Sequence, residues 1–253
     1  MSRFVGIVSG KGGVGKTTTA INLGMVLTNF GRDVVIVDAN LKTPNVGLQL
    51  GISRMPITLH DAVRGNAHIA DAAYKHISGL RIIPASISFE DSKTKAHKSL
   101  SDTMLDLHGK VDIALLDIAA GLNDEVTDAM KACDNLLVVV TPDMPSVTDA
   151  LKTIKLAEEI GVRVFGVIVN KSGDDELTTQ NIETILEKPV IGVVPYDDNV
   201  GKSLKCKFPV VYSHPESAAS YSYKKLAATL LGEEFRETLQ KESVLSRLMK
   251  KFK

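Results

Sequence analysis

Short runs rich in Val, Ile and Leu alternate along the chain with longer stretches that have helical periodicity and polar faces. The runs are apolar at successive positions, which is typical of parallel strands covered by helices on both faces. This alternation predicts an α/β fold with a doubly wound, mostly parallel sheet. The strand-like runs are residues 4–9, 33–38, 80–85, 111–117, 135–141, 162–170 and 189–195, and the helical stretches are 16–29, roughly 91–107, 147–160, 177–187 and 217–231.

The pattern changes only at the C-terminal end of the chain. Residues 233–253 are charged, helical in character and not followed by a strand-like run. We therefore expect one α/β domain, residues 1–232, and an appended amphipathic tail, residues 233–253. The chain of 253 residues, 44% of them hydrophobic, is long enough to build one large core for such a domain.

The amino-acid composition argues against several classes of protein. Lys plus Arg and Asp plus Glu both total 30, so no global field draws the chain to nucleic acid or lipid. Cys133 and Cys206 are far apart and form no CxxC pair, which argues against a disulfide framework, a zinc site or an iron–sulfur carrier and suits a reducing cytoplasm. The start of the chain runs straight into a strand-like segment, so no signal peptide is expected, and no apolar run approaches the ~18 residues of a membrane-spanning helix.

The most specific motif follows the first apolar run and matches G-x-x-x-x-G-K-[ST], a phosphate-binding loop. Its backbone N–H groups would surround phosphate oxygens at the N-terminus of the next helix. Lys16 is expected to reach the β- and γ-phosphates, and the Thr17 hydroxyl to bind Mg²⁺. The predicted nucleotide contacts here are Gly10, Lys11, Gly12, Gly13, Val14, Gly15, Lys16, Thr17 and Thr18.

Two carboxylates end strand-like runs, where ligands of an open parallel sheet bind. Asp117 is expected to hold Mg²⁺ directly or through a water, and Asp38 to be a metal-shell or water-orienting group. The predicted metal site is therefore Thr17, Asp38 and Asp117. Gly121, four residues after Asp117, would let the backbone approach a γ-phosphate.

Residues after the last two strand-like runs are candidates for contact with the base. Asn170 carries both a donor and an acceptor, which matches the edge of adenine. Pro195 and Asp197 belong to a segment expected to close the base pocket. The pair Asn170-Lys171 loosely resembles the guanine signature NKxD, but Gly173 stands where the Asp would be, which favours ATP over GTP.

The stretch KGGVGKT resembles the deviant Walker A motif of the MinD/ParA family of P-loop ATPases. VDANLKTPNVGLQLG (37–51) is similar to the family's switch I, and LLDIAAGL (115–122) to its switch II. Segments 141–152 and 191–200 resemble later parts of MinD, and the likeness covers most of residues 1–232. The resemblance implies ATP and Mg²⁺ as cofactors and an ATP-dependent homodimer.

Lys11 and Asn40 gain their interpretation from this resemblance. In the family the early lysine crosses a face-to-face dimer to the partner's phosphates, as an arginine finger does; from the residues alone, Lys11 could equally be solvated or contact phosphate in its own subunit. The family generally has a second aspartate two residues after Asp38, where this chain has Asn40. An amide orients water but is no useful base, and general-base catalysis contributes roughly 10²–10⁴ in rate. Hydrolysis of ATP should therefore be slow, assisted by a group from elsewhere, or lost. The alternative is that Asn40 is simply a turn residue. The candidate catalytic residues are Lys11, Lys16, Asp38 and Asn40.

The tail has an apolar stripe at i, i+3, i+4 and i+7, with Arg247 and three lysines on its flanks and rear. This pattern suits an interfacial helix on anionic lipid and resembles the membrane-targeting helix of MinD. Packing on the chain's own domain, with Phe235 and Leu239 extending the stripe, and contact with a partner protein are the alternatives. The expected membrane residues are Leu245, Leu248, Met249 and Phe252.

Together these features predict a slow ATPase switch of the MinD type, cytoplasmic and reversibly peripheral on the inner face of the cell membrane. It would position an unidentified protein partner, and the segment 145–149 opens the helix that would offer contacts. One rival is a ParA-like DNA-partition ATPase, against which the balanced charge and the tail argue; a gel shift with ATP at low salt would discriminate. The other is an ATP-gated scaffold that does not hydrolyse ATP, motivated by Asn40.

Overall fold

The computed structural model of the chain describes residues 2–52, 54–93 and 97–233. In these ranges an eight-stranded sheet has the order β3-β4-β2-β5-β1-β6-β7-β8. All neighbours are parallel except the short pair β3–β4. The strands are β1 (Arg3–Val8), β2 (Val34–Asp38), β3 (Tyr74–Lys75), β4 (Arg81–Ile83), β5 (Ile113–Asp117), β6 (Asn135–Val140), β7 (Arg163–Ser172) and β8 (Val190–Pro195).

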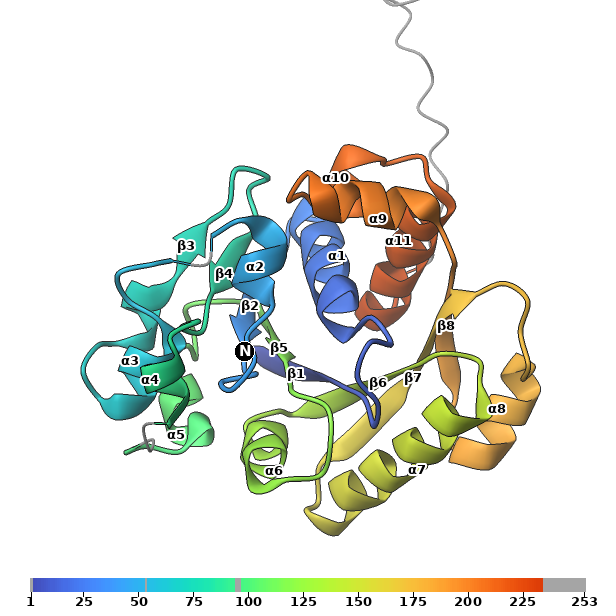
Figure 1. Ribbon diagram of the computed structural model, residues 1–253, viewed down its shortest axis with the longest axis horizontal. Helices are drawn as coiled ribbons and strands as arrows, with labels where there is room; N and C mark the ends of the chain where they lie inside the picture. Colours follow the sequence, from blue (N-terminus) through green and yellow to red (C-terminus); the bar gives the residue numbers. More distant parts are fainter. Residues whose placement is uncertain (1, 53, 94–96, 234–253) are drawn as a thin grey trace, which may run out of the picture.

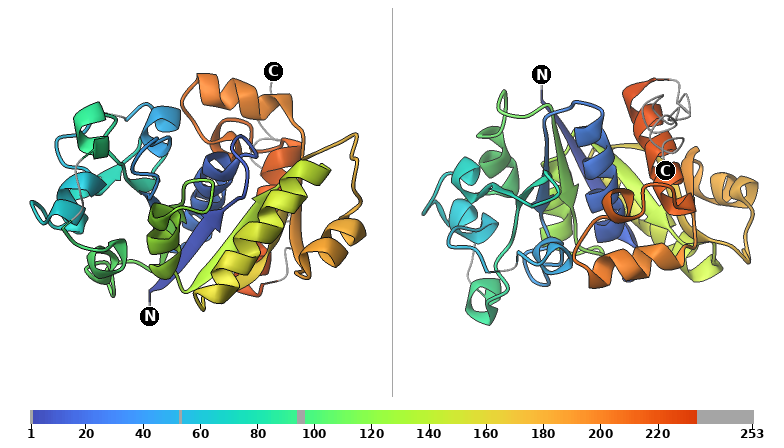
Figure 2. Two further views of the ribbon diagram at one scale, coloured as in Figure 1. Left: turned by 60° about the horizontal axis from the view of Figure 1, so that its bottom comes forward. Right: turned by 90° about the horizontal axis from the view of Figure 1, so that it is seen from above.

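Helices cover both faces of this sheet (Figures 1 and 2), because successive strand residues point to opposite faces and both faces are apolar. Ile36 and Leu115 belong to one core cluster, whereas Val35 and Leu116 belong to the other. The first face carries α1 (Lys16–Asn29), α2 (Val46–Leu50), α9 (Asp198–Lys205), α10 (Val210–Ser213) and α11 (Ala218–Leu231). The second carries α3 (Leu59–Arg64), the 3₁₀ helix η1 (Ile69–Ala72), α5 (Leu100–Leu105), α6 (Asp124–Lys131), α7 (Met144–Glu159) and α8 (Thr179–Leu186).

The predicted fold class is confirmed, and each of the seven expected strands is present. Helix α1 has the expected bounds. The single helix expected at roughly 91–107 is wrong: α4 (Phe89–Lys93) and α5 are separate elements, and residues 97–99 are not helical. The reason is local, because the Ser99 hydroxyl accepts a hydrogen bond from the Asp102 amide and so caps a new helix.

The predicted division of the chain into residues 1–232 and a tail stays a prediction. Apart from Glu233, the tail lies outside the described residues, and so does its expected helix. Within the described ranges, none of the helices combines the length and the apolar character needed to cross a bilayer.

The fold brings the loops that follow β1, β2, β5, β7 and β8 to one edge of the sheet. This edge faces the reader in Figure 1, with the loop between β1 and α1 near its centre. In an open parallel sheet, this carboxyl edge is where ligands bind. The candidate residues identified from the sequence therefore meet there.

Candidate functional site

The loop between β1 and α1 needs its glycines for two physical reasons. Gly13 and Gly15 have φ angles of 80° and 99°, in the left-handed region that residues with a Cβ atom avoid. Gly10 instead packs against α7, where an added Cβ would lie 2.2 Å from the Asp149 carbonyl group. The loop therefore has the tight turns and close packing that let backbone N–H groups face a phosphate.

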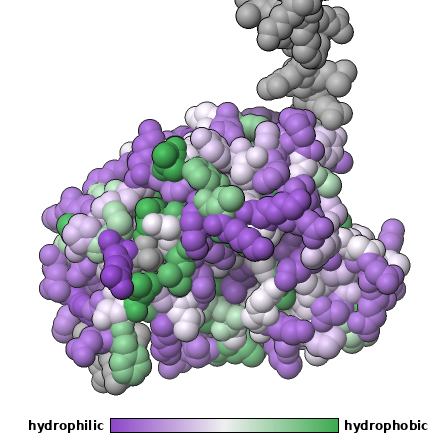
Figure 3. Space-filling view, turned by 45° about the horizontal axis from the view of Figure 1, so that its top comes forward, coloured by the Kyte–Doolittle hydropathy of each residue, from purple (hydrophilic) through white to green (hydrophobic). Residues whose placement is uncertain are grey.

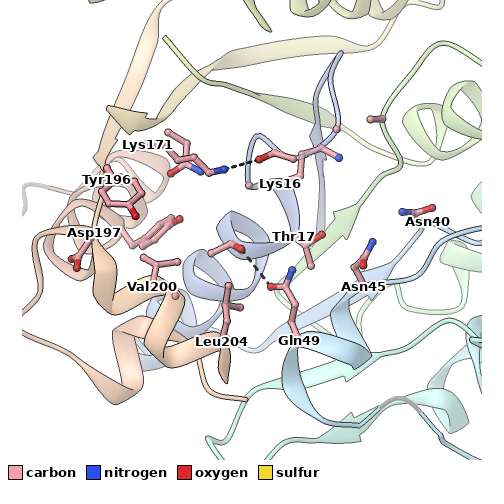
Figure 4. A pocket seen from close by; sticks show the side chains of 18 of the residues that line it. Lys16, Thr17, Asn40, Asn45, Gln49, Lys171, Tyr196, Asp197, Val200 and Leu204 are labelled. Carbon is pink, nitrogen blue, oxygen red and sulfur yellow. Dashed lines mark hydrogen bonds between the residues drawn. The ribbon is translucent and has the colours of Figure 1, made fainter. Parts of the chain in front are cut away.

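Two side chains at the end of β7 hold this loop by its backbone. The Asn170 Nδ2 donates to the Val14 carbonyl oxygen at 2.7 Å. The Lys171 Nζ, labelled in Figure 4, donates to the Gly13 carbonyl oxygen at 2.8 Å. These contacts fix the loop from the neighbouring part of the sheet. The Asn170 Oδ1 is not used in this contact, and the role of Asn170 at a purine base stays a prediction. The sequence pattern drew attention to Lys171 only as part of NKxD and missed its contact with the loop.

A cavity of about 660 Å³ lies beside the loop, within the usual size range of ligand pockets in proteins. Gly15 is among the residues that line it. Thr17 lines it from the start of α1, Gln49 from α2 and Leu204 from α9, and Tyr196 lies just before α9 (Figure 4). The sequence missed Gln49 and the α9 wall because α2 and α9 are short and α9 is largely polar. Of the predicted nucleotide contacts, the lining includes Gly12, Gly13, Gly15, Lys16, Thr17, Thr18, Asn170, Pro195 and Asp197.

The predicted metal residues come together at the ends of adjacent strands. Asp38 and Asp117 are register partners in the β2–β5 ladder, and both are fully buried. The Thr17 hydroxyl donates to Asp117 Oδ2 at 2.6 Å, and Asp38 Oδ2 accepts from the backbone N–H groups of Asn45 and Val46, each at 2.9 Å. The other carboxylate oxygen of each aspartate, Oδ1, is buried and has no hydrogen-bond partner among the described residues. Two such oxygens beside a hydroxyl are the hard donors that Mg²⁺ prefers, so the residues fit this ion.

Burial makes this pair of carboxylates electrostatically costly. Desolvation, and then repulsion from Asp117, raise the pKa of Asp38 well above its ordinary value. Desolvation likewise raises the pKa of Asp117 to about 6, although the Thr17 hydrogen bond and the Lys16 charge oppose the shift. Burial lowers the pKa of Lys16, against the attraction of Asp117. A divalent cation would offset the repulsion between the carboxylates and neutralise phosphate charge.

Replacing Asp117 by Asn is expected to stabilise the ligand-free protein at pH 8. The Asp117 carboxyl binds its proton more tightly in the folded protein than in the unfolded chain. The contribution of this group to the free energy of unfolding therefore falls as pH rises from about 4 to about 6, and it stays low above pH 6. A pKa that is about two units higher in the folded state corresponds to a destabilisation of at most about 3 kcal/mol once the group is ionised. Asp117→Asn should therefore raise the free energy of unfolding by about 1–3 kcal/mol at pH 8 and change it little below pH 4.

Denaturant unfolding at the two pH values, with and without Mg²⁺ and ADP, measures this difference. The variant should also lose the Mg²⁺-dependent part of the stabilisation by nucleotide, because it lacks one carboxylate. A variant that is less stable than the natural chain at pH 8 without ligand would contradict the electrostatic account.

Asn40 lines the cavity but is also a turn residue. Its Oδ1 accepts hydrogen bonds from the Thr43 backbone N–H at 3.1 Å and from the Thr43 hydroxyl at 3.0 Å. The amide oxygen that would orient water is therefore already engaged in the loop after β2. These hydrogen bonds agree with the interpretation of Asn40 as a turn residue. The catalytic role of Asn40 stays a prediction.

Lys11 lies in the phosphate loop but is not among the residues that line the cavity. Its Nζ is 3.7 Å from Asp143 Oδ1, and its side chain is 47% exposed. Asp143 also accepts from the Ser146 N–H and so caps α7. The Lys11 charge is thus held over the first turn of α7, outside its own nucleotide cavity.

The remaining predicted residues have the following positions. Gly121 follows β5 with a φ angle of 108°, and its neighbours Ala119 and Ala120 line the cavity. Asp197 accepts from the N–H groups of Asn199 and Ala219, so its carboxylate joins α9 to α11. The tail residues Leu245, Leu248, Met249 and Phe252 lie outside the described residues.

A parallel sheet that delivers a glycine loop, a lysine and two buried carboxylates to one cavity has the design of a P-loop nucleotide-binding protein. Comparison with known proteins agrees with this class. The model of the CobQ/CobB/MinD/ParA nucleotide-binding domain matches residues 5–210, and the chain belongs to this family. The predicted resemblance to MinD/ParA proteins is confirmed, and ATP with Mg²⁺ fits this family and this site.

Three known proteins illustrate the relationship. An ATP-binding protein of Methanocaldococcus jannaschii is 38% identical over 99% of this chain and 96% of its own length. The septum site-determining protein MinD of Pyrococcus horikoshii, complexed with Mg-ADP, is 32% identical with a TM-score of 0.86, covering 91% of this chain and 96% of its own. MinD in the MinC:MinD cell division complex of Aquifex aeolicus is 28% identical with a TM-score of 0.80, covering 93% and 98% of the two chains.

Proposed function

We propose that the chain is a Mg-ATP-dependent dimerising switch of the MinD type, with slow ATP hydrolysis. Lys16 and the phosphate loop would bind the phosphates, while Thr17, Asp38 and Asp117 would hold Mg²⁺. Support comes from the two buried carboxylate oxygens that lack a partner within the described ranges, and from the similarity to a MinD that binds Mg-ADP. The similarity to MinD also favours ATP over GTP.

The main observation in support of the proposed dimer is the position of Lys11. A phosphate-binding loop that already has Lys16 has no local need for a second lysine, and this one stands exposed at the edge of the cavity without lining it. In the single chain its cation is held by Asp143 across 3.7 Å on a partly exposed surface, and it would exchange this partner for the phosphates of a second subunit that approaches this face. Because the added charge helps only when both subunits hold a triphosphate, association would depend on ATP.

Membrane association and a protein partner complete the proposal. The basic amphipathic pattern at residues 241–253 suits anionic lipid, and two tails on one dimer would bind with far greater avidity than one. The MinC:MinD complex of a similar protein supports a partner protein as the output. The process served would be the placement of a division site or of another cellular assembly.

Dimerisation and vesicle binding of the full chain should both require ATP. Light scattering should give a dimer with Mg²⁺ and a non-hydrolysable ATP analogue but a monomer with ADP. Vesicles that contain an anionic lipid should sediment the ATP form at least about tenfold better than the ADP form, because the dimer presents two tails. A protein that stays monomeric when saturated with Mg²⁺ and the analogue would overturn the switch. Equal sedimentation with both nucleotides would remove the link between nucleotide and membrane.

A scaffold that binds but does not hydrolyse ATP is the second candidate. The engaged Oδ1 of Asn40 favours it, since this oxygen already accepts from Thr43. The two candidates share the binding site and the dimer and differ only in phosphate release. Phosphate release by the natural chain above that of Lys16→Ala separates them, and a variant at position 40 tests the missing base, as argued in the Discussion.

A further inference from the structure

Three exposed apolar side chains come from separate segments along one edge of the molecule. Ile77, in the turn between β3 and β4, is 80% exposed; Tyr212, in α10, is 48% exposed; and Leu48, in α2, is 43% exposed. We name these three residues the α10 patch. None of them lines the nucleotide cavity. A single exposed apolar side chain is ordinary on a protein surface, but a group of them is a candidate contact surface.

Interactions beneath the patch join its three segments into one surface. The His76 ring packs edge-on against Phe208, with 5.4 Å between the centroids, and Phe208 stacks on Tyr212 at 5.2 Å. Lys207 Nζ donates to the Leu48 carbonyl oxygen at 3.0 Å, which ties α2 to the end of α9. Figure 1 shows the β3–β4 turn, α2 and α10 close together, and Figure 3 shows apolar surface to the left of the centre, over this part of the molecule.

The segments that carry the α10 patch contain charge of a single sign. The segments that carry it, residues 46–52, 74–79 and 204–213, contain Lys75, Lys205 and Lys207 but no Asp or Glu. All three lysines are exposed. Apolar side chains at a turn and a short helix, flanked by exposed cations, suit the headgroup region of an anionic bilayer. The whole chain has no net charge, so this local bias is not a reflection of its composition.

The covalent length of the chain allows the patch and the tail to reach one bilayer. Glu233, the last described residue, forms an ion pair with Arg32 just after the end of α1. Eleven residues, 234–244, separate it from Leu245. At about 3.3–3.6 Å per residue such a segment spans up to roughly 40 Å, which is comparable with the diameter of a domain of this size.

We propose that the α10 patch is a second membrane contact, in which Ile77 and Tyr212 enter the headgroup boundary of an anionic bilayer while Lys75 and Lys205 meet its phosphates. This inference rests on the proposed function, because it adds a contact to a membrane-associating chain. Its consequence is orientation. If only the tail binds, the nucleotide-binding domain is free to rotate above the membrane. Two membrane contacts, the tail and the α10 patch, would hold the domain in one orientation.

The absence of tryptophan from the chain provides a direct test. Ile77→Trp places the only indole at the tip of the β3–β4 turn. With Mg²⁺ and an ATP analogue, its fluorescence should shift to the blue on phosphatidylcholine–phosphatidylserine vesicles and be quenched by brominated acyl chains. Leu105→Trp is the matched control, because Leu105 is 60% exposed but lies on α5 over the opposite face of the sheet. If the emission of the Ile77→Trp variant stays unshifted while the protein sediments with the vesicles, the proposal is overturned.

Affinity for vesicles provides the second test. Ile77→Asp should weaken binding to the mixed vesicles by about tenfold or more, and Lys75→Gln or Lys205→Gln by roughly fivefold each at low salt. Leu105→Asp should bind as the natural chain does, and all variants should retain their affinity for ATP. If the natural chain binds and Ile77→Asp binds equally well, the second contact fails while the proposed function stands. If the natural chain binds no vesicles, the membrane part of the proposed function fails with it.

Discussion

Lys11→Ala is expected to abolish ATP-dependent dimerisation while leaving nucleotide binding nearly intact. In one chain, Lys11 is held by Asp143 and does not line the cavity, so its loss should change ATP affinity less than about threefold. In the proposed dimer the same charge is desolvated against a triphosphate. Removing one member of such a pair costs about 2–5 kcal/mol, which corresponds to at least roughly thirtyfold in affinity at each of two equivalent sites.

Sedimentation equilibrium with a non-hydrolysable ATP analogue, together with titration of a fluorescent nucleotide, measures the two effects separately. Lys155→Ala is the matched control, because Lys155 also forms one surface ion pair, with Glu158 at 3.1 Å on α7. Lys16→Ala should instead lose nucleotide binding itself. A Lys11→Ala protein that dimerises as well as the natural chain would show that its cation does not act between subunits.

Asn40→Asp is expected to raise the rate of phosphate release by about 10², the lower part of the range for a general base. One carboxylate oxygen can keep the hydrogen bonds from Thr43, and the other is then available to a water. The substitution therefore preserves the turn and adds the proton acceptor that the natural side chain lacks.

Phosphate release at saturating Mg-ATP provides the measurement, with Lys16→Ala as the background. Asn45→Asp is the matched control, since Asn45 lies in the same loop, lines the same cavity and would gain the same charge. An equal gain in both variants would mean that charge alone matters. No gain in Asn40→Asp would mean that the arrangement of the site, and not the missing base, limits hydrolysis.

Residues with a strict local requirement were predictable from the sequence. Gly13 and Gly15 adopt backbone angles that only glycine accepts readily, and Lys16 and Thr17 stand at fixed places after them. Asp38 and Asp117 end apolar strands, so their meeting follows from the parallel order of the sheet. The helix α1 was also clear, because a long and mostly apolar stretch, buried from Thr19 to Leu27, follows the loop.

Features that depend on contacts distant in sequence were not predictable. The contact of Lys171 with the Gly13 carbonyl oxygen joins residues 158 positions apart. The pairing of Lys11 with Asp143 is equally invisible until the loop and α7 are placed together. Strand β3 has only two residues, too few for any periodicity, and so gave no signal of the antiparallel edge. The pattern in α9 is weak because Ser203 is its only fully buried residue.

The facing aspartates of β2 and β5 also have a consequence for the lifetime of the protein. A ligand-free chain carries the repulsion of two buried carboxylates, whereas Mg-ATP would relieve it. When magnesium and nucleotide are scarce, more chains would be empty, unfold more often and be degraded sooner by proteases. The abundance of this protein would then follow the supply of its ligand without a dedicated regulator.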